Sequence, residues 1–174
     1  MDIVLAKTIH ALSDYIKENP VDLVVVHGDR VEALAGAITG SLNNTLVAHI
    51  EGGEVSGTID ELIRHAVSKM SHMHFVSNDQ ARTRLLQLGE HRDMIKIIGS
   101  PDIDIMNSED LPGLDEVKSY YSIPFAQYAI LIYHPVTTEY QQTRAHIKEV
   151  IAGASMSKKN FVLIYPNNDL GSED

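Results

Sequence analysis

At 174 residues, 44% of them hydrophobic, the chain is long enough to bury the core of one domain, or of one domain and part of a second. Its 24 acidic residues outnumber 14 basic ones, and the formal net charge of -10 repels phosphate backbones, so nucleic acid is not an expected partner. Cysteine is absent and no apolar run approaches the roughly 18 residues of a membrane span, so we expect no thiolate chemistry, no membrane partner and a cytoplasmic location.

The first half of the sequence alternates helix and strand patterns. Residues 3–18 carry apolar side chains at steps of three and four, so they predict an amphipathic helix, which Asn19-Pro20 ends. The predicted strands that follow are 22–27, 45–50, 73–76 and 94–98, and the predicted helices between them are 31–42, 58–70 and 77–88. Short apolar strands joined by crossovers of this length are typical of βαβ units, so we predict an α/β fold with a parallel sheet.

Two of these helices open with the residue spacing of a capping box. Thr58 is followed three residues later by Glu61, and Ser77 by Gln80. We therefore predict Thr58 and Ser77 as N-caps. The N-terminus of the helix at 58–70 should then point back toward the ends of the strands.

The second half of the chain begins after a stretch rich in acidic and turn residues. Residues 107–115 have little apolar content, and we place a domain boundary there, between 112 and 113. Beyond the boundary, the patterns predict helices at 116–121 and 139–156 and strands at 128–134 and 161–166. The chain therefore combines one βα domain with a smaller unit of the same kind.

Ionisable residues follow two neighbouring strands, at the points where the strands end. Asp29 and Arg30 come after the first strand, Glu51 comes after the second, and Asp60 lies at the start of the next helix. The carboxyl ends of adjacent parallel strands face one crevice, so we expect these side chains to converge there.

Three carboxylates in one crevice should spread their pKa values. Repulsion and partial burial would leave one of Asp29, Glu51 and Asp60 protonated and another ionised near neutral pH. Such a set supplies an acid and a base for moving protons at a sugar carbon. The guanidinium of Arg30 could donate two parallel hydrogen bonds to a diphosphate.

Each carboxylate also has a structural interpretation. Asp29 follows a glycine and could be only a turn residue or a helix cap. Asp60 suits the dipole of its helix and has the spacing to pair with Arg64. Glu51 precedes two glycines, which let a charged loop approach a ligand closely, so function is favoured there.

The histidines and glycines predict neither a metal nor a cofactor. His72 and His74 could hold zinc, but no third ligand accompanies them, so half-buried strand histidines are favoured. The glycine-rich segments match neither a dinucleotide fingerprint nor a P-loop. His134 differs, because a hydroxyl-rich turn suited to an anionic ligand follows it.

Six motifs stand along the chain in order. They are VHGDR (26–30), HIEGGEVSGTIDE (49–61), IRH (63–65), GSPDID (99–104), YHPVTTE (133–139) and YPNND-x-GSE (165–173). Together they resemble the hydrolysing UDP-N-acetylglucosamine 2-epimerases, of the bacterial sialic-acid pathway type. The resemblance covers essentially the whole chain, although family members are roughly twice as long.

The resemblance implies a GT-B-type fold with a UDP-sugar bound between two Rossmann-like domains. Residues 1–112 would be an N-terminal Rossmann-like domain that lacks its first strands, and 113–174 the beginning of the C-terminal one. By motif, Asp29, Glu51 and Asp60 match the acid/base carboxylates of the family. Arg30, His134 and Asn167 match positions near the UDP moiety.

The resemblance also implies the reaction and its partners. UDP-N-acetylglucosamine and water would give N-acetylmannosamine and UDP through a 2-acetamidoglucal, without a cofactor. The full-length enzyme would be a homo-oligomer, a dimer or a tetramer. We expect little turnover from the 174-residue chain alone.

Other functions stay open from the sequence. The same reaction could act on UDP-N,N'-diacetylbacillosamine, in legionaminic acid synthesis. The chain could instead be a non-catalytic oligomerising module. A retaining glycosyltransferase of the same fold is disfavoured by the three carboxylates.

Overall fold

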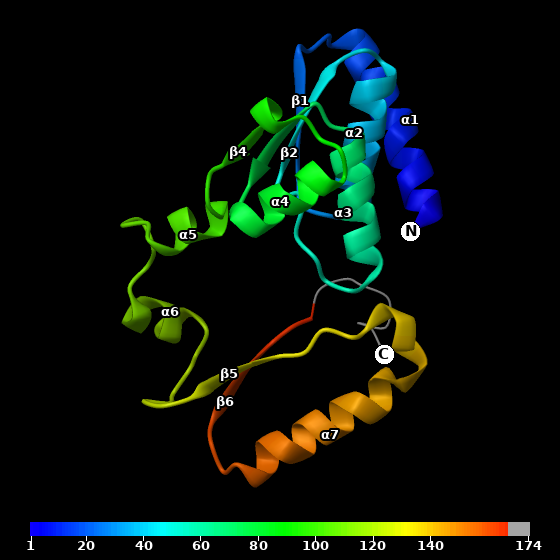
Figure 1. Cartoon of the computed structure of the whole chain (residues 1–174). Coiled ribbons are helices and arrows are strands. Elements are labelled where there is room, and N and C mark those ends of the chain that lie inside the picture. Colours follow the sequence, from blue (N-terminus) through cyan, green and yellow to red (C-terminus); the bar gives the residue numbers. More distant parts are fainter. Residues whose placement is uncertain (167–174) are drawn as a thin grey trace. The chain divides into compact units, whose positions relative to one another are not determined.

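The computed structural model describes residues 1–166, apart from the side chains of residues 137, 138 and 140. The chain divides into two compact units, Met1–Ser108 and Glu109–Asp174. The division falls within the acidic, turn-rich stretch at 107–115, four residues before the boundary expected after residue 112. Figure 1 shows the elements of both units.

The first unit is built on a parallel sheet of strands in the order β1-β2-β3-β4. Its elements are α1 (Asp2–Glu18), β1 (Leu23–His27), α2 (Val31–Leu42), β2 (Leu46–Ile50), α3 (Ile59–Lys69), β3 (Met73–Val76), α4 (Asp79–Gln87), η1 (Arg92–Met94), β4 (Ile95–Ile97) and α5 (Pro101–Met106). Every pair of neighbouring strands is parallel, so the predicted α/β fold with a parallel sheet is confirmed.

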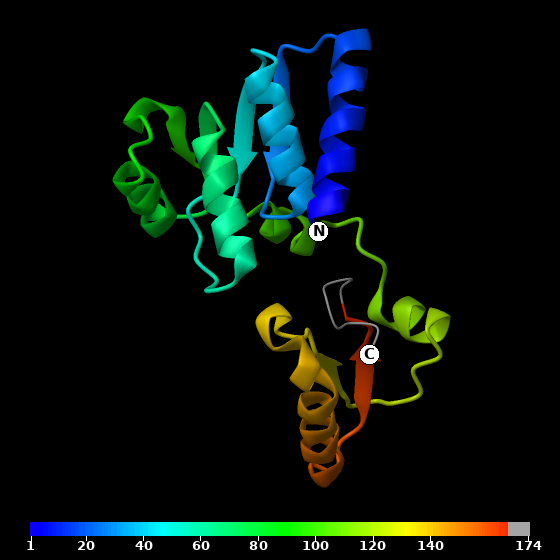
Figure 2. The same ribbon diagram turned by 90° about the vertical axis from the view of Figure 1, so that its right-hand side faces the viewer.

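The helices that connect these strands cover one face of the sheet. Right-handed crossovers between consecutive parallel neighbours place α2, α3 and α4 on the same side. Figure 2 shows α1, α2 and α3 side by side in this layer. Glycine lets α2 approach the sheet closely, because a Cβ atom on Gly40 would lie 2.6 Å from Cγ2 of Val47 and one on Gly36 would lie 2.8 Å from Cγ1 of Val26.

The N-cap predicted for α4 is wrong by one residue. The cap is Asn78, whose side-chain oxygen accepts a hydrogen bond from the backbone N–H of Ala81 at 2.9 Å. The side chain of asparagine carries a carbonyl oxygen that can accept this hydrogen bond. Asn78 is therefore the N-cap of α4, whereas the residue spacing had predicted Ser77.

Thr58 is the N-cap of α3, as predicted, but the capping box does not form. The Thr58 side chain makes no capping hydrogen bond. The carboxylate of Glu61 accepts hydrogen bonds from the backbone N–H groups of Ser56, at 2.9 Å, and Gly57, at 2.7 Å. Glu61 therefore holds the loop before the helix rather than the cap residue itself.

The second unit contains a two-stranded parallel sheet. Its elements are α6 (Leu114–Tyr120), β5 (Ala129–Ile132), η2 (Thr137–Gln142), α7 (Thr143–Met156) and β6 (Phe161–Ile164), with Ala129 in register with Phe161. The helix predicted over 139–156 is divided into η2 and α7. None of the helices in the described part of the chain could span a membrane.

Candidate active site

The carboxyl ends of β1 to β4 lie along one edge of the sheet, because the strands are all parallel. Gly28 to Arg30 follow β1, the loop from Glu51 to Thr58 follows β2, and Ser100, the N-cap of α5, stands after β4. This carboxyl edge therefore holds the predicted carboxylates, on segments that are far apart in the sequence.

Glu51 is fixed at this edge by groups from two strands, β1 and β3, and from the N-cap of α5. Its Oε1 atom accepts a hydrogen bond from Oγ of Ser100 at 2.9 Å, and its Oε2 atom lies 2.9 Å from Nε2 of His27. Its backbone N–H donates to the carbonyl of Phe75 at 2.8 Å. Glu51 also has a φ of +66°, which is uncommon for a residue other than glycine. Strained backbone held by several contacts is typical of functional sites.

The electrostatic surroundings keep Glu51 ionised. Burial raises the pKa of its carboxyl, but hydrogen bonds from His27 and Ser100 and the electrostatic effects of His27 and Arg64 outweigh burial and hold it below its ordinary value. The sequence predicted that repulsion between carboxylates would leave one member of the set protonated. Glu51 is not that member, because its neighbours in the structure are cationic or hydrogen-bond donors.

Arg64 of α3 contacts both the segment that follows β1 and the loop that follows β2. Its guanidinium forms an ion pair with Asp29, and its Nη1 atom donates to the carbonyl of Glu54 at 3.1 Å. The Arg64 side chain is only 11% exposed, so this contact is largely shielded from water. The structural interpretation of Asp60 rested on its spacing to Arg64, one helical turn away, but the ion pair that Arg64 forms in the structure is with Asp29.

Asp60 lies half-buried in the first turn of α3. One of its carboxylate oxygens accepts a hydrogen bond from the Thr58 hydroxyl at 3.2 Å. Arg64 follows one turn later on the same helix, and its guanidinium pairs with Asp29. Of the three predicted carboxylates, Asp29 is therefore ion-paired with Arg64, Glu51 is hydrogen-bonded to His27 and Ser100, and Asp60 is hydrogen-bonded to Thr58.

The residues predicted near UDP are distributed over the whole chain. Arg30 is the exposed N-cap of α2, at the carboxyl edge. His134 is exposed and follows β5 in the second unit. Asn167 lies outside the described residues. Of these three residues, Arg30 belongs to the first unit, at the same edge of the sheet as the predicted carboxylates.

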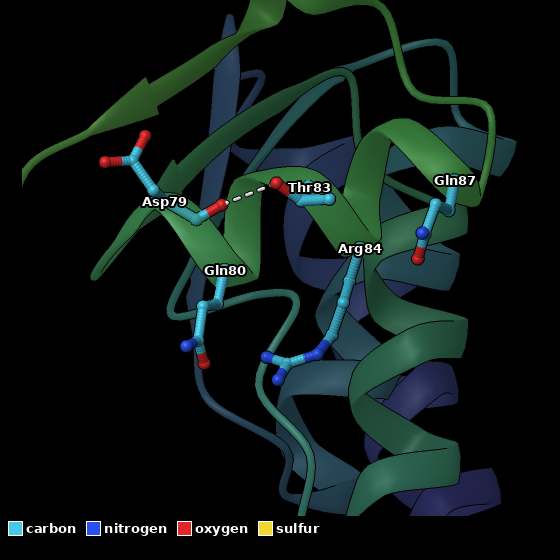
Figure 3. A pocket seen from close by; sticks show the side chains of 5 residues that line it. All are labelled: Asp79, Gln80, Thr83, Arg84 and Gln87. Carbon is cyan, nitrogen blue, oxygen red and sulfur yellow. Dashed lines mark hydrogen bonds between the residues drawn. The ribbon is translucent and has the colours of Figure 1, made fainter.

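The loop after β2 is fastened to α4 as well as to α3. Nη1 of Arg84 donates to the carbonyl of Gly53 at 3.0 Å and lies 3.8 Å from the carboxylate of Glu54. The Asn78 side chain donates to Glu54 at 2.9 Å. Figure 3 shows the Arg84 side chain extending from α4 beside a surface hollow of about 360 Å³ that one side of this helix forms. That hollow contains none of the predicted site residues, and Arg84 serves to hold the loop.

The buried side chain of His49 also contributes to the structure of the carboxyl edge. It is fully buried in β2, and its Nε2 atom lies 2.9 Å from the carbonyl of Gly28. A carbonyl only accepts, so Nε2 carries the proton and Nδ1 accepts from the Ser68 hydroxyl at 3.0 Å. A Cβ atom on Gly52 would lie 2.8 Å from that same hydroxyl oxygen. The buried imidazole therefore positions the turn before Asp29 and the loop after Glu51 together.

The free energy of unfolding should depend on pH through His49. Burial lowers the pKa of His49 to about 4, against the opposing effect of its hydrogen bond to the Gly28 carbonyl. Between pH 6.5 and 4 the unfolded chain binds a proton there that the folded chain does not, so stability falls as the pH falls, by about 3 kcal/mol. Above pH 6.5 both states are neutral at this residue and the effect vanishes.

Urea unfolding of the wild type and His49→Gln at pH 7, 5.5 and 4.5 measures this dependence. The variant, which cannot titrate, should lose less stability with acid than the wild type. His10→Gln, which removes an exposed histidine of α1, should follow the wild type. If NMR showed the His49 imidazole becoming protonated near pH 6.5 in the folded chain, the interpretation would be wrong.

The histidines considered for zinc have other partners. Nδ1 of His72 accepts from the backbone N–H of Val47 at 3.1 Å, and Nε2 of the buried His74 lies 3.2 Å from the carboxylate of Glu90. Within residues 1–166, no group of three or more His, Asp or Glu side chains is placed to hold a metal ion.

Three residues that matter at the carboxyl edge were not among the predicted site residues. They are Arg64, which binds Asp29, and His27 and Ser100, which bind Glu51. All three lie within the sequence motifs at 26–30, 63–65 and 99–104. The motifs thus contained the signal, but neither helical periodicity nor capping rules assign such long-range partners.

The fold and the site define a class of protein: a Rossmann-like α/β protein with its ionisable groups at the carboxyl edge of a parallel sheet. The chain belongs to the UDP-N-acetylglucosamine 2-epimerase family, whose sequence model matches residues 1–174. The suspected relationship is therefore confirmed.

Individual relatives agree with this assignment. A UDP-N-acetylglucosamine 2-epimerase of Neisseria meningitidis serogroup B is 51% identical over 173 residues, which are 99% of this chain and 46% of that protein. A UDP-N,N'-diacetylbacillosamine 2-epimerase (hydrolyzing) of Legionella pneumophila is 37% identical over 86% of this chain and 40% of its own length. The chain therefore spans about half the length of the curated relatives it matches.

A solved structure supports the fold. The UDP-GlcNAc 2-epimerase of Methanocaldococcus jannaschii, solved in complex with UDP-GlcNAc and UDP, matches 97% of this chain and 48% of its own chain, with a TM-score of 0.83 and 20% sequence identity. At that identity the likeness establishes the fold alone. It confirms the expectation that the chain corresponds to part of a GT-B-like fold.

Proposed function

We propose that this chain carries the acid/base residues of a hydrolysing UDP-N-acetylglucosamine 2-epimerase. The enzyme would convert UDP-N-acetylglucosamine and water into N-acetylmannosamine and UDP, for sialic acid biosynthesis. The observation that carries the proposal is the ionised carboxylate of Glu51, which His27 and Ser100 hold at the carboxyl edge of the sheet. The 51% identity to the Neisseria meningitidis relative supports this substrate first.

The chemistry of the reaction fits these residues. The hydrogen on C2 of the sugar is not next to a carbonyl, so it becomes acidic only as the C1–O bond breaks and positive charge develops at C1. Ionised carboxylates close to C1 stabilise that charge. Glu51 is held in that state, and Asp29 is held in place by Arg64. Asp60 is proposed as the third carboxylate of this set.

The remaining assignments are proposals about the whole protein. Arg30, His134 and Asn167 would contact the UDP moiety. Residues 1–112 and 113–174 would belong to the two Rossmann-like domains between which the sugar nucleotide binds. The full-length enzyme would act as a homo-oligomer, without a metal or other cofactor.

A second substrate deserves a direct comparison. The Legionella pneumophila relative is named for UDP-N,N'-diacetylbacillosamine, which differs from UDP-N-acetylglucosamine at C4 and C6 of the sugar. The groups at the carboxyl edge would act at C1 and C2, which the two sugars share. Both substrates should therefore be assayed, and the ratio of their kcat/KM values decides between them.

The test is a chimaera in which residues 1–174 replace the matching segment of the Neisseria meningitidis relative. With UDP-N-acetylglucosamine, the chimaera should release UDP and N-acetylmannosamine in equal amounts, while the 174-residue chain alone releases little. The unaltered relative is the positive control. A folded chimaera without turnover on either sugar nucleotide would refute the proposal, and formation of UDP-N-acetylmannosamine would refute its hydrolytic part.

A further inference from the structure

The contact between His27 and Glu51 fixes which ring nitrogen of His27 carries a proton. Nε2 of His27 lies 2.9 Å from Oε2 of Glu51. An ionised carboxylate only accepts hydrogen bonds, so Nε2 must donate and therefore bears the hydrogen. In the neutral imidazole the unshared electron pair then lies on Nδ1. This nitrogen forms no hydrogen bond with any of the described residues.

The His27 side chain is also accessible. Val24 and Val26 of β1 face α2, so His27, one position after Val26, lies on the opposite side of the strand from the helix layer. Its side chain is 49% exposed, whereas that of Glu51 is 24% exposed. A ligand at the carboxyl edge can thus reach the imidazole more readily than the carboxylate.

Both oxygens of Glu51 are already engaged. Oε1 accepts from Ser100 and Oε2 accepts from His27. The same hydrogen bonds help to hold the pKa of Glu51 below its ordinary value, although burial opposes them, and a weaker base removes a carbon-bound proton less efficiently. A carboxylate with a lowered pKa and both oxygens hydrogen-bonded is better suited to orient a histidine and stabilise its protonated form than to act as the base itself.

We propose that His27 is the catalytic base that removes the C2 proton and that Glu51 orients it; this inference rests on the proposed function. In the step, the C2–H bond breaks and its proton passes to Nδ1 of His27. The electron pair of that bond forms the C1=C2 double bond. The C1–O bond breaks at the same time, and its electron pair leaves with UDP. The products are the 2-acetamidoglucal, UDP and an imidazolium stabilised by Glu51.

Kinetics of the chimaera test the role of His27. His27→Gln should lower kcat by roughly 10²- to 10⁴-fold with a much smaller change in KM. The double variant His27→Gln/Glu51→Gln should have a kcat no more than about threefold lower than that of the less active single variant, because the two residues act as a unit. His10→Gln, which removes another exposed histidine paired with a carboxylate, should leave kcat unchanged.

Chemical rescue separates a base from a merely structural side chain. Added imidazole should restore activity to His27→Ala but not to Glu51→Gln, because only the first variant leaves a space where a base is missing. A His27→Gln chimaera that keeps kcat within threefold of the wild type would overturn the inference. A His27→Ala chimaera that is folded, inactive and insensitive to imidazole would overturn it too.

Nitrogen-15 NMR of the 174-residue chain gives a readout that does not depend on turnover. Near pH 8, neutral His27 should show a protonated Nε2 and a bare Nδ1 in the wild type, and a mixture of tautomers in Glu51→Gln. If the wild-type chimaera proved inactive, the proposed function would fall, and this spectrum would still decide the orientation of His27. A ring protonated on Nδ1 would overturn the inference in either case.

Discussion

Replacing Glu51 with glutamine is expected to lower the kcat of the chimaeric enzyme by roughly 10²- to 10⁴-fold, with a much smaller change in KM. Glutamine keeps the size of the side chain and can still contact Ser100 and His27, so the fold of the edge should survive. The variant loses the negative charge that stabilises both the imidazolium and the positive charge at C1. Initial rates of UDP release over a range of substrate concentrations measure both constants.

Glu90→Gln is the matched control for this experiment. Glu90 also pairs with a histidine, since its carboxylate lies 3.2 Å from Nε2 of His74, but it stands in the connection that enters β4, at the other end of the sheet. Its replacement should cost stability and leave kcat within about threefold of the wild type. Equal losses in Glu51→Gln and Glu90→Gln would mean that Glu51 has only a structural role.

Gly53→Ala is expected to destabilise the first unit by about 2–4 kcal/mol. Gly53 has a φ of +79°, and a Cβ atom there would lie 2.4 Å from the carbonyl oxygen of Ala81. That oxygen belongs to the backbone of α4 and cannot rotate away, so either the loop or the helix must shift. The shift would also lengthen the hydrogen bond that Arg84 donates to the Gly53 carbonyl, which is 3.0 Å long in the wild type.

Gly57→Ala separates backbone strain from the clash. Gly57 lies in the same loop with a φ of +69°, but a Cβ atom there would have no atom within 4 Å. The Gly57→Ala variant should therefore lose only about 1 kcal/mol in free energy of unfolding, from the strain of a non-glycine residue in the left-handed region. Urea unfolding followed by circular dichroism compares the two variants. Free energies of unfolding that agree within about 0.5 kcal/mol would show that the loop does not pack against α4 in this way.

Local sequence patterns were sufficient to predict the framework of the first unit. The β-branched run at 23–27 and the Ala- and Gly-rich helix after it lie where they were expected, and so does the parallel sheet. These features depend on interactions between residues close in sequence and on the apolar pattern of each element. The short helix α5 was missed, because its six residues are too few to establish a periodicity.

The partners at the site could not be predicted in the same way. The spacing of four residues favoured Asp60 for Arg64, but Asp29, 35 residues away in the sequence, forms the ion pair. Glu51 and Ser100 are 49 residues apart and meet only because the strands that precede them, β2 and β4, end at one edge of the sheet. Such contacts follow from the order of strands in the sheet, which the sequence pattern of a single element does not contain.

The most direct test of the account follows the hydrogen on C2 of the sugar. The chimaeric enzyme is supplied with UDP-N-acetylglucosamine in D₂O, and the N-acetylmannosamine that it releases is examined by NMR and mass spectrometry. If groups at the carboxyl edge remove the C2 proton and a group exchanging with solvent returns one, the product carries a single deuterium, at C2. N-acetylmannosamine that retains its original hydrogen at C2 would contradict the account.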